Sequence, residues 1–229
     1  MAVIGELAPD AATGARAAVA TWLRELYPGS DPPWVAPMRP DLLAEQLLAT
    51  CPQLSELILA GYAQIDAPGQ LEQLLTELTR AETRTPVFEA LDRLLTAHLP
   101  VLLTITTEAP SSRLPNLLDL ALTRCPQMKA AAMLVSRLPE RSTGLAALAA
   151  TLTSQAVDFH RGLAAAGREA FTPDLAAALN NLAGRLADVG RREDALAAIE
   201  EAVALRRELA AARPEAFTCL LYTSPSPRD

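Results

Sequence analysis

A repeat of 46 residues constrains the fold of this chain more than any other sequence feature. Glu169-Ala170-Phe171-Thr172 recurs 46 residues later as Glu215-Ala216-Phe217-Thr218, and the same offset aligns Arg161 with Arg207. Leu163–Ala166 likewise match Leu209–Ala212. A period between about 20 and 50 residues is typical of proteins that stack copies of one small structural unit. The sequence therefore predicts a stacked array, in which residues 172–217 form one complete unit preceded by a degenerate one.

The complete unit predicts two helices joined by a glycine. We expect Thr172 to be the N-cap and Pro173 the first residue of a helix that runs to about Val189. Leucines at three- and four-residue spacing form the inner face of this helix: Leu175, Leu179, Leu182 and Leu186. Gly190 ends the helix because glycine adopts positive φ without strain. A second helix then begins near Arg192, and its predicted inner face carries Ala195, Leu196, Ile199, Ala202, Val203 and Leu209.

The rest of the chain also predicts helices. Aromatic residues make up only 4% of the chain and hydrophobic residues 50%, so the core is built mainly from Leu and Ala, which favour helices over sheets. Seven prolines stand where a proline suits the start of a Leu- or Ala-rich helix: Pro40, Pro52, Pro86, Pro100, Pro115, Pro126 and Pro173. We predict an all-α fold, an α-solenoid of helical hairpins whose helices are short over the first 140 residues.

The complete unit resembles a known repeat family. The run Leu179-x-x-Leu182-Ala183-x-x-Leu186-x-x-x-Gly190-x-x-x-x-Ala195-x-x-x-Ile199-x-x-Ala202 is similar to the tetratricopeptide repeat. Its repeat-defining positions are Leu182, Ala183, Leu186, Gly190, Ala195, Ile199 and Ala202. Leu179 stands where tryptophan is common, and Arg207 stands where the terminal proline belongs. The lengthened second helix resembles the longer repeats of the kinesin-light-chain type.

This resemblance implies a partner-binding surface on the first helix of the unit. In tetratricopeptide arrays this helix lines the concave groove, and the positions carried over are Ala177, Asn180, Gly184, Ala187 and Asp188, with Asn181 beside them. The amide of Asn180 can bond either the backbone of a bound peptide or that of a neighbouring helix, and both interpretations stay open. For Asn181 we favour the bond to a neighbouring helix.

Two further segments bear on the organisation of the chain. Residues 22–28 and 40–45 resemble the stretch that follows the ATPase module in actinobacterial signal-transduction ATPases with numerous domains. This chain has no Gly-x-x-x-x-Gly-Lys-[Ser/Thr] phosphate loop, so that resemblance implies an ATPase module upstream. Residues 219–229 are similar to translated sequencing-adapter DNA, and we expect the natural protein to continue with more repeats. We divide the chain into a helical arm of short helices (1–128), tetratricopeptide-like repeats (129–218) and this non-native tail (219–229).

The sequence shows no pattern typical of catalysis or metal binding. His98 and His160 have no partner at His-x-x-x-His spacing, and Cys51, Cys125 and Cys219 show no Cys-x-x-Cys spacing. We expect the histidines at helix ends or on the surface, and Cys51 and Cys125 buried as small apolar side chains. The pairs Glu193-Asp194 and Glu200-Glu201 predict a solvated helix face. We therefore expect no catalytic residues, no cofactor, no metal site and no enzymatic activity.

Charge and hydropathy limit the class of partner. A net charge of −7 disfavours nucleic-acid binding, and the longest apolar run is too short to span a membrane. We predict a cytoplasmic, non-catalytic segment of a larger bacterial regulatory protein, which binds a protein or peptide partner. The alternative is the sensor arm of a signal-transduction ATPase whose phosphate-loop domain is missing from this chain. A third possibility, the effector domain of a transcription regulator, requires a separate DNA-binding module.

Overall fold

Every element that the described residues form is a helix. The computed structural model describes residues 51, 53–63, 65, 68–80, 85–139, 142–167 and 169–212. In chain order, the α-helices and short 3₁₀ helices (η) are α4 (Leu54–Tyr62), α5 (Pro68–Arg80), α6 (Thr85–Glu108), α7 (Leu114–Arg124), α8 (Met128–Leu134), η1 (Val135–Arg137), η2 (Thr143–Leu145), α9 (Ala146–Ala165), η3 (Glu169–Phe171), α10 (Thr172–Asp188) and α11 (Arg192–Ala212). The predicted all-α class is confirmed.

The chain divides into two compact units, residues 1–97 and residues 98–229. In the first unit, buried leucines on α5 and on the first half of α6 supply most of the described core: Leu71, Leu75, Leu78, Leu91, Leu94 and Leu95. The limits predicted at residues 128 and 218 refer to repeats rather than to compact units, and they stay predictions.

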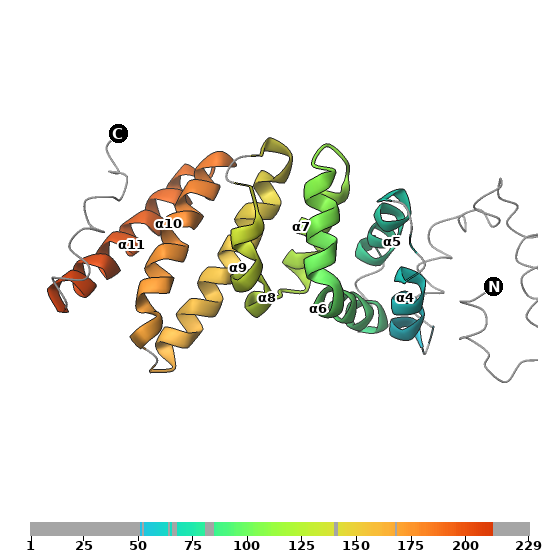
Figure 1. The fold of residues 1–229 in the computed structure, drawn as a ribbon, viewed down its shortest axis with the longest axis horizontal. Coiled ribbons are helices and arrows are strands. Elements are labelled where there is room, and N and C mark those ends of the chain that lie inside the picture. Colours follow the sequence, from blue (N-terminus) through green and yellow to red (C-terminus); the bar gives the residue numbers. More distant parts are fainter. Residues whose placement is uncertain are drawn as a thin grey trace, which may run out of the picture. The chain divides into compact units, whose positions relative to one another are not determined.

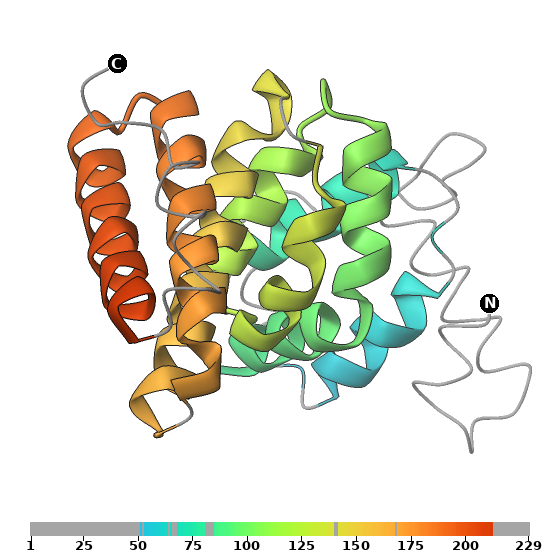
Figure 2. The ribbon, with the colours of Figure 1, turned by 60° about the vertical axis from the view of Figure 1, so that its left-hand side comes forward.

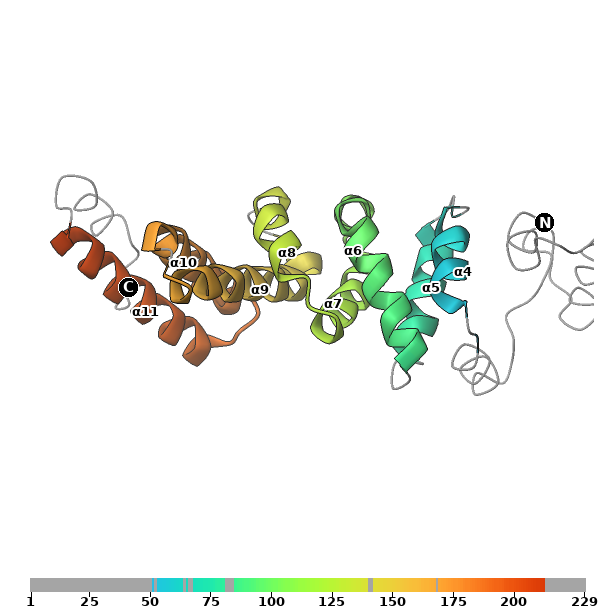
Figure 3. The same cartoon turned by 90° about the horizontal axis from the view of Figure 1, so that it is seen from below.

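In the second unit, α9 is the central helix. It packs against α7 and α8 on one side and against α10 on the other, and α10 in turn packs against α11 (Figures 1 and 3). Because it has several neighbours, α9 buries residues over more than half of its circumference, among them Leu148, Leu152, Gln155 and Val157. The order α9, α10, α11 is also seen when the molecule is turned (Figure 2).

The predicted inner faces of α10 and α11 are largely confirmed. Leu175, Leu179, Leu182, Ala183 and Leu186 of α10 are buried in one cluster with Ala195, Ala198, Ile199 and Ala202 of α11. The small side chains let the two helices approach closely. Leu196 was predicted to belong to this face and does not, since it is 45% exposed. A rotation of about 100° per residue carries Leu196 away from Ala195, and Ala198 takes the inner position instead.

The turn between α10 and α11 is a complete glycine C-cap. Gly190 has φ of 81°, as predicted for the residue that ends α10. The N–H of Gly190 donates to the carbonyl of Ala187 at 3.0 Å, and the N–H of Arg191 donates to that of Leu186 at 2.9 Å. These two bonds define the Schellman motif, which satisfies the last carbonyls of the helix.

The start of α10 differs from the prediction by one residue. Thr172 is already helical, Phe171 is the N-cap, and no side chain caps the helix. The cause is η3, which runs directly into α10 and gives Phe171 near-helical backbone angles (φ −91°, ψ −1°). Thr172 therefore lacks the extended backbone that a side-chain N-cap requires.

Two predictions for the prolines and helix lengths are wrong. Pro100 does not begin a helix but lies inside α6, and α6 has 24 residues although short helices were expected there. Burial explains both, because Leu95, Leu99, Leu102 and Leu103 form a buried stripe that continues across the proline. The ring of Pro100 is exposed, so it displaces no packed side chain. Pro86, Pro115 and Pro173 do lie at helix starts, whereas Pro126 lies two residues before α8 and is not helical. Pro40 and Pro52 lie outside the described residues.

Candidate functional site

The partner-binding positions predicted from the sequence lie along one side of α10. We call Ala177, Asn180, Gly184, Ala187 and Asp188 the α10 face. Four of the five are exposed and Asn180 is half-buried. The leucines of α10 point into the core, and a rotation of about 100° per residue puts the α10 face on roughly the opposite side of the helix. The structure therefore gathers these residues on one accessible strip, while their role in binding stays a prediction.

Asn180 is the one polar residue of the α10 face with a buried side-chain atom. Its Oδ1 is buried and accepts no hydrogen bond from the described residues. The interpretation that this oxygen serves a neighbouring helix therefore has no support in the described part of the chain. Asn181 is fully on the exposed side, and no hydrogen bond to a neighbouring helix is found for it either.

A groove that the sequence did not predict lies on the other side of α10, between α9 and α11. Its volume is about 700 Å³. The floor is made by Leu179, Leu182 and Leu186 of α10, and none of the α10 face contributes to it. We call it the α9–α11 groove. The walls come from α7, α9 and α11 and include Asp119, Ala147, Ala150, Ser154, Gln155, Arg161, Asp194, Ala197, Ala198 and Glu201.

Alanine explains why this groove is hollow. Ala147 and Ala150 on α9 and Ala197 and Ala198 on α11 line the groove together with the leucines of α10. The methyl side chain of alanine is too short to fill the space between α9 and α11, which α10 holds apart. The result is an open trough with an apolar floor rather than a closed cavity, because many of its wall residues are exposed.

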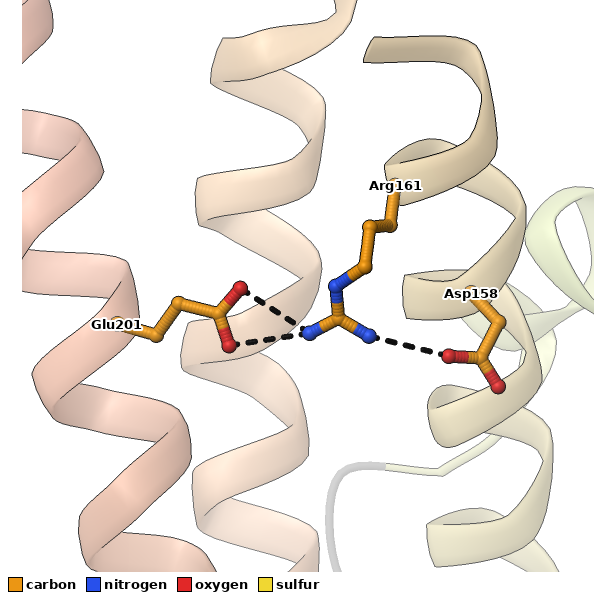
Figure 4. Close-up of polar contacts among 3 residues, drawn as sticks. All are labelled: Asp158, Arg161 and Glu201. Atoms are coloured by element: carbon orange, nitrogen blue, oxygen red, sulfur yellow. Dashed lines mark hydrogen bonds and ion pairs between the residues drawn. The ribbon is translucent and has the colours of Figure 1, made fainter. Parts of the chain in front are cut away.

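One ion pair crosses the groove above α10. Nη2 of Arg161 on α9 donates to both carboxylate oxygens of Glu201 on α11, at 3.1 and 3.0 Å. Nη1 of Arg161 donates to Oδ1 of Asp158, one turn away on the same helix, at 3.1 Å. Figure 4 shows the guanidinium extended over α10 between the two carboxylates. Arg161 thus joins two helices that are otherwise separated by α10.

The remaining charges of the groove are unequally matched. Nε of Arg191 donates to Oδ2 of Asp194 at 2.7 Å, so this pair is neutral. Asp119, on α7, has no such partner, and its Oδ1 is buried without a hydrogen bond from the described residues. Gln155 beside it is satisfied, since its Nε2 donates to the carbonyl of Leu122 at 2.8 Å and its Oε1 accepts from the N–H of Gln127 at 2.9 Å.

The cysteines and histidines of the described residues lie in different parts of the chain. Cys125 is buried at 1% exposure, as predicted, whereas Cys51 is only partly buried. His98 lies inside α6 rather than at a helix end, and His160 is half-buried near the end of α9 with its ring edge-on to Phe159. The described residues hold no group of three or more His, Cys, Asp or Glu placed to bind a metal ion. The pKa of Tyr62, in the first unit, is raised by burial.

Some predictions concern residues outside the described part of the chain. These are the segments 22–28 and 40–45 and the tail 219–229. Among the described helices, none combines the length and the apolar character needed to cross a membrane. Comparison of the chain with protein-family models, with curated proteins and with solved structures finds no match. The proposed function therefore rests on the hairpin of α10 and α11 and on the 46-residue sequence repeat.

Proposed function

We propose that this chain is a non-catalytic protein-interaction module of the tetratricopeptide type, which binds a protein or peptide partner. The observation that carries the proposal is the packing of α10. This helix contacts α9 and α11 through its leucines and leaves the α10 face exposed along its length. A helix held rigidly from one side, with its other side open, is a stable platform for a second chain.

The composition of the α10 face supports this use. Ala177, Gly184 and Ala187 have no side chain long enough to keep a partner away from the helix, so a peptide backbone can approach closely. Asp188 and the amide of Asn180 supply the few polar groups that a bound peptide needs for orientation.

Peptide selection on the full 229-residue chain tests the proposal. A displayed library of random 12-residue peptides is selected on the immobilised chain, and the affinities of recovered peptides are measured in solution. We expect peptides that bind the folded chain and lose affinity after thermal unfolding. If no peptide is enriched over a surface without the protein, the proposal is wrong. Catalytic turnover by the purified chain that a point substitution abolishes would also contradict it.

A regulatory arm of a signal-transduction ATPase is the more specific form of the proposal. It is favoured by the resemblance of residues 22–28 and 40–45 to the stretch after the ATPase module of such proteins. Long-read sequencing of the source DNA across both ends of the reading frame tests it. An in-frame phosphate-loop motif upstream supports the regulatory arm, whereas a stop codon in that position supports a separate interaction module.

A further inference from the structure

We propose that the α9–α11 groove binds a basic peptide segment, with a Lys or Arg of the peptide placed at Asp119 and apolar side chains over the leucine floor. The proposal rests on the proposed function, because it specifies where an interaction module takes a partner and which chemistry that partner has. The α9–α11 groove is then a second binding surface of the module, on the opposite side of α10 from the α10 face.

The groove has the size and lining of a peptide site. A volume of about 700 Å³ lies within the range of clefts that bind drug-sized ligands, so the groove can admit a short part of a peptide. Its floor is apolar, and its walls carry exposed residues such as Ser154 and Ala197. An open trough of this kind lets a chain enter and leave along its length, whereas a small molecule is better held in an enclosed cavity.

The charge of the groove selects a cationic occupant. Three carboxylates line it, those of Asp119, Asp194 and Glu201, against the two guanidinium groups of Arg161 and Arg191. Both arginines are already engaged, since Arg161 bonds Glu201 and Asp158 and Arg191 bonds Asp194. No cation of the groove is left for an anionic partner, and one negative charge is left over.

Asp119 is the residue that carries this surplus charge. It projects from α7 at the wall formed with α9, and its Oδ1 is buried without a donor in the described part of the chain. A carboxylate in partly apolar surroundings is costly unless donors satisfy it. The ammonium of lysine or the guanidinium of arginine, placed against the part of Asp119 that lines the groove, supplies the opposite charge and a hydrogen-bond donor.

Four variants of the full chain separate this groove from the α10 face. Asp119→Asn removes the charge in the groove with almost no change of shape, and Asp188→Asn makes the same change on the α10 face. Ala197→Phe fills the groove from an exposed wall position, and Ala187→Phe adds the same bulk on the α10 face. All four positions are partly or fully exposed, and circular dichroism verifies that each variant is folded.

The peptides recovered from the random library are measured against these variants at two salt concentrations. We expect the peptides to contain Lys or Arg, and we expect Asp119→Asn and Ala197→Phe each to weaken binding about tenfold or more. A recovered peptide whose binding Asp188→Asn or Ala187→Phe weakens instead is assigned to the α10 face. Added salt weakens binding to the natural chain more than binding to the Asp119→Asn variant, because the variant lacks the charge that salt screens.

Three results would overturn the inference. Recovered peptides without basic residues remove the argument from charge. Binding that is sensitive to Asp188→Asn or Ala187→Phe but not to the groove variants places the partner on the α10 face, so that the proposed function stands and the groove is not the site. A library from which no peptide is enriched contradicts the proposed function and this inference together.

Discussion

Arg161 and Glu201 are 40 residues apart in the sequence, yet their side chains form a two-oxygen hydrogen-bonded ion pair over the top of α10. The pair connects α9 to α11, and both residues are close to half exposed, with side-chain exposures of 48% and 43%. Solvent therefore weakens the attraction, and the role of the pair is to relate two helices rather than to supply much stability.

A double-mutant cycle measures this pair directly. We expect Arg161→Met and Glu201→Gln to couple by roughly 0.2–1 kcal/mol in the free energy of unfolding, the range of exposed ion pairs. The coupling falls toward zero at about 1 M salt because the Debye length is then near 3 Å. Asp158→Asn is the control, since it removes the other partner of Arg161 without touching α11. A coupling above 2 kcal/mol would show that the pair is effectively buried.

The glycines of α10 and of its C-cap respond oppositely to alanine. Gly190→Ala forces an L-residue into the left-handed region at φ 81° and destabilises the chain by roughly 1–2 kcal/mol. Gly184→Ala, inside α10 with no neighbouring atom near a new Cβ, stabilises it by about 0.5–1 kcal/mol. Urea unfolding of the two variants measures both values. No loss of stability in Gly190→Ala would contradict the positive-φ cap, and a loss in Gly184→Ala would contradict the open space around Gly184.

Gly144 is required for a close backbone contact. A Cβ at this position, in η2, would collide with the carbonyl of Pro110, and a backbone group cannot move aside as a flexible side chain can. We expect Gly144→Ala to destabilise the chain by roughly 1–3 kcal/mol, the range for overpacked sites. Gly162→Ala in α9, where a Cβ meets nothing, is the matched control and should not destabilise. Thermal unfolding compares them.

Gln155 stabilises the passage from α7 to α8. It bonds the carbonyl of Leu122, one of the last four of α7, and the N–H of Gln127 at the start of α8. Gln155→Met keeps the size but removes both bonds, so we expect a loss of roughly 1–3 kcal/mol. Thr153→Val is the control, because its buried hydroxyl only bonds the carbonyl of Ala149 within α9. Denaturant unfolding that ranks Thr153→Val as the more damaging change would contradict this role.

Tyr62 gives the chain a dependence on alkaline pH. Burial raises the pKa of its phenol above 10.0, so the folded state holds this proton more tightly than the unfolded state does. The associated stability is present below pH 10 and is lost as the pH rises through the folded-state pKa. Absorbance of tyrosinate in a Tyr27→Phe/Tyr222→Phe variant should show a higher midpoint in buffer than in concentrated urea. Equal midpoints would show that Tyr62 is solvated.

The helices could be predicted where the signal is local. The inner leucines of α10 and the turn at Gly190 follow from residue spacing alone. In the structure these leucines are buried and Gly190 has positive φ, as predicted. Leu196 is hydrophobic, but its position in the helical repeat points it away from the inner face of α11, so hydrophobicity alone predicts the wrong location. Pro100 was misplaced because the preference of proline for helix starts is weaker than the burial of leucines on both of its sides.

The groove could not be predicted because its residues meet only after packing. Asp119, Arg161 and Glu201 come from three helices, and no spacing in the sequence relates them. The pairs Asp158–Arg161 and Arg191–Asp194 are each three residues apart, so local spacing can suggest these two pairs. The hollow also depends on packing. α10 keeps α9 and α11 apart, and the alanines on those two helices are too short to fill the space between them.

Pro100 has a consequence for how the chain loses its structure. A proline supplies no N–H to the carbonyl of Thr96, so the hydrogen-bond ladder of α6 lacks one rung. The boundary between the two compact units falls inside that same turn, after Ala97. The hydrogen-bond ladder of α6 is thus interrupted where the two units divide, and unfolding of one unit can end at this interruption. We therefore expect denaturant unfolding to show two transitions, each with its own free energy, rather than one.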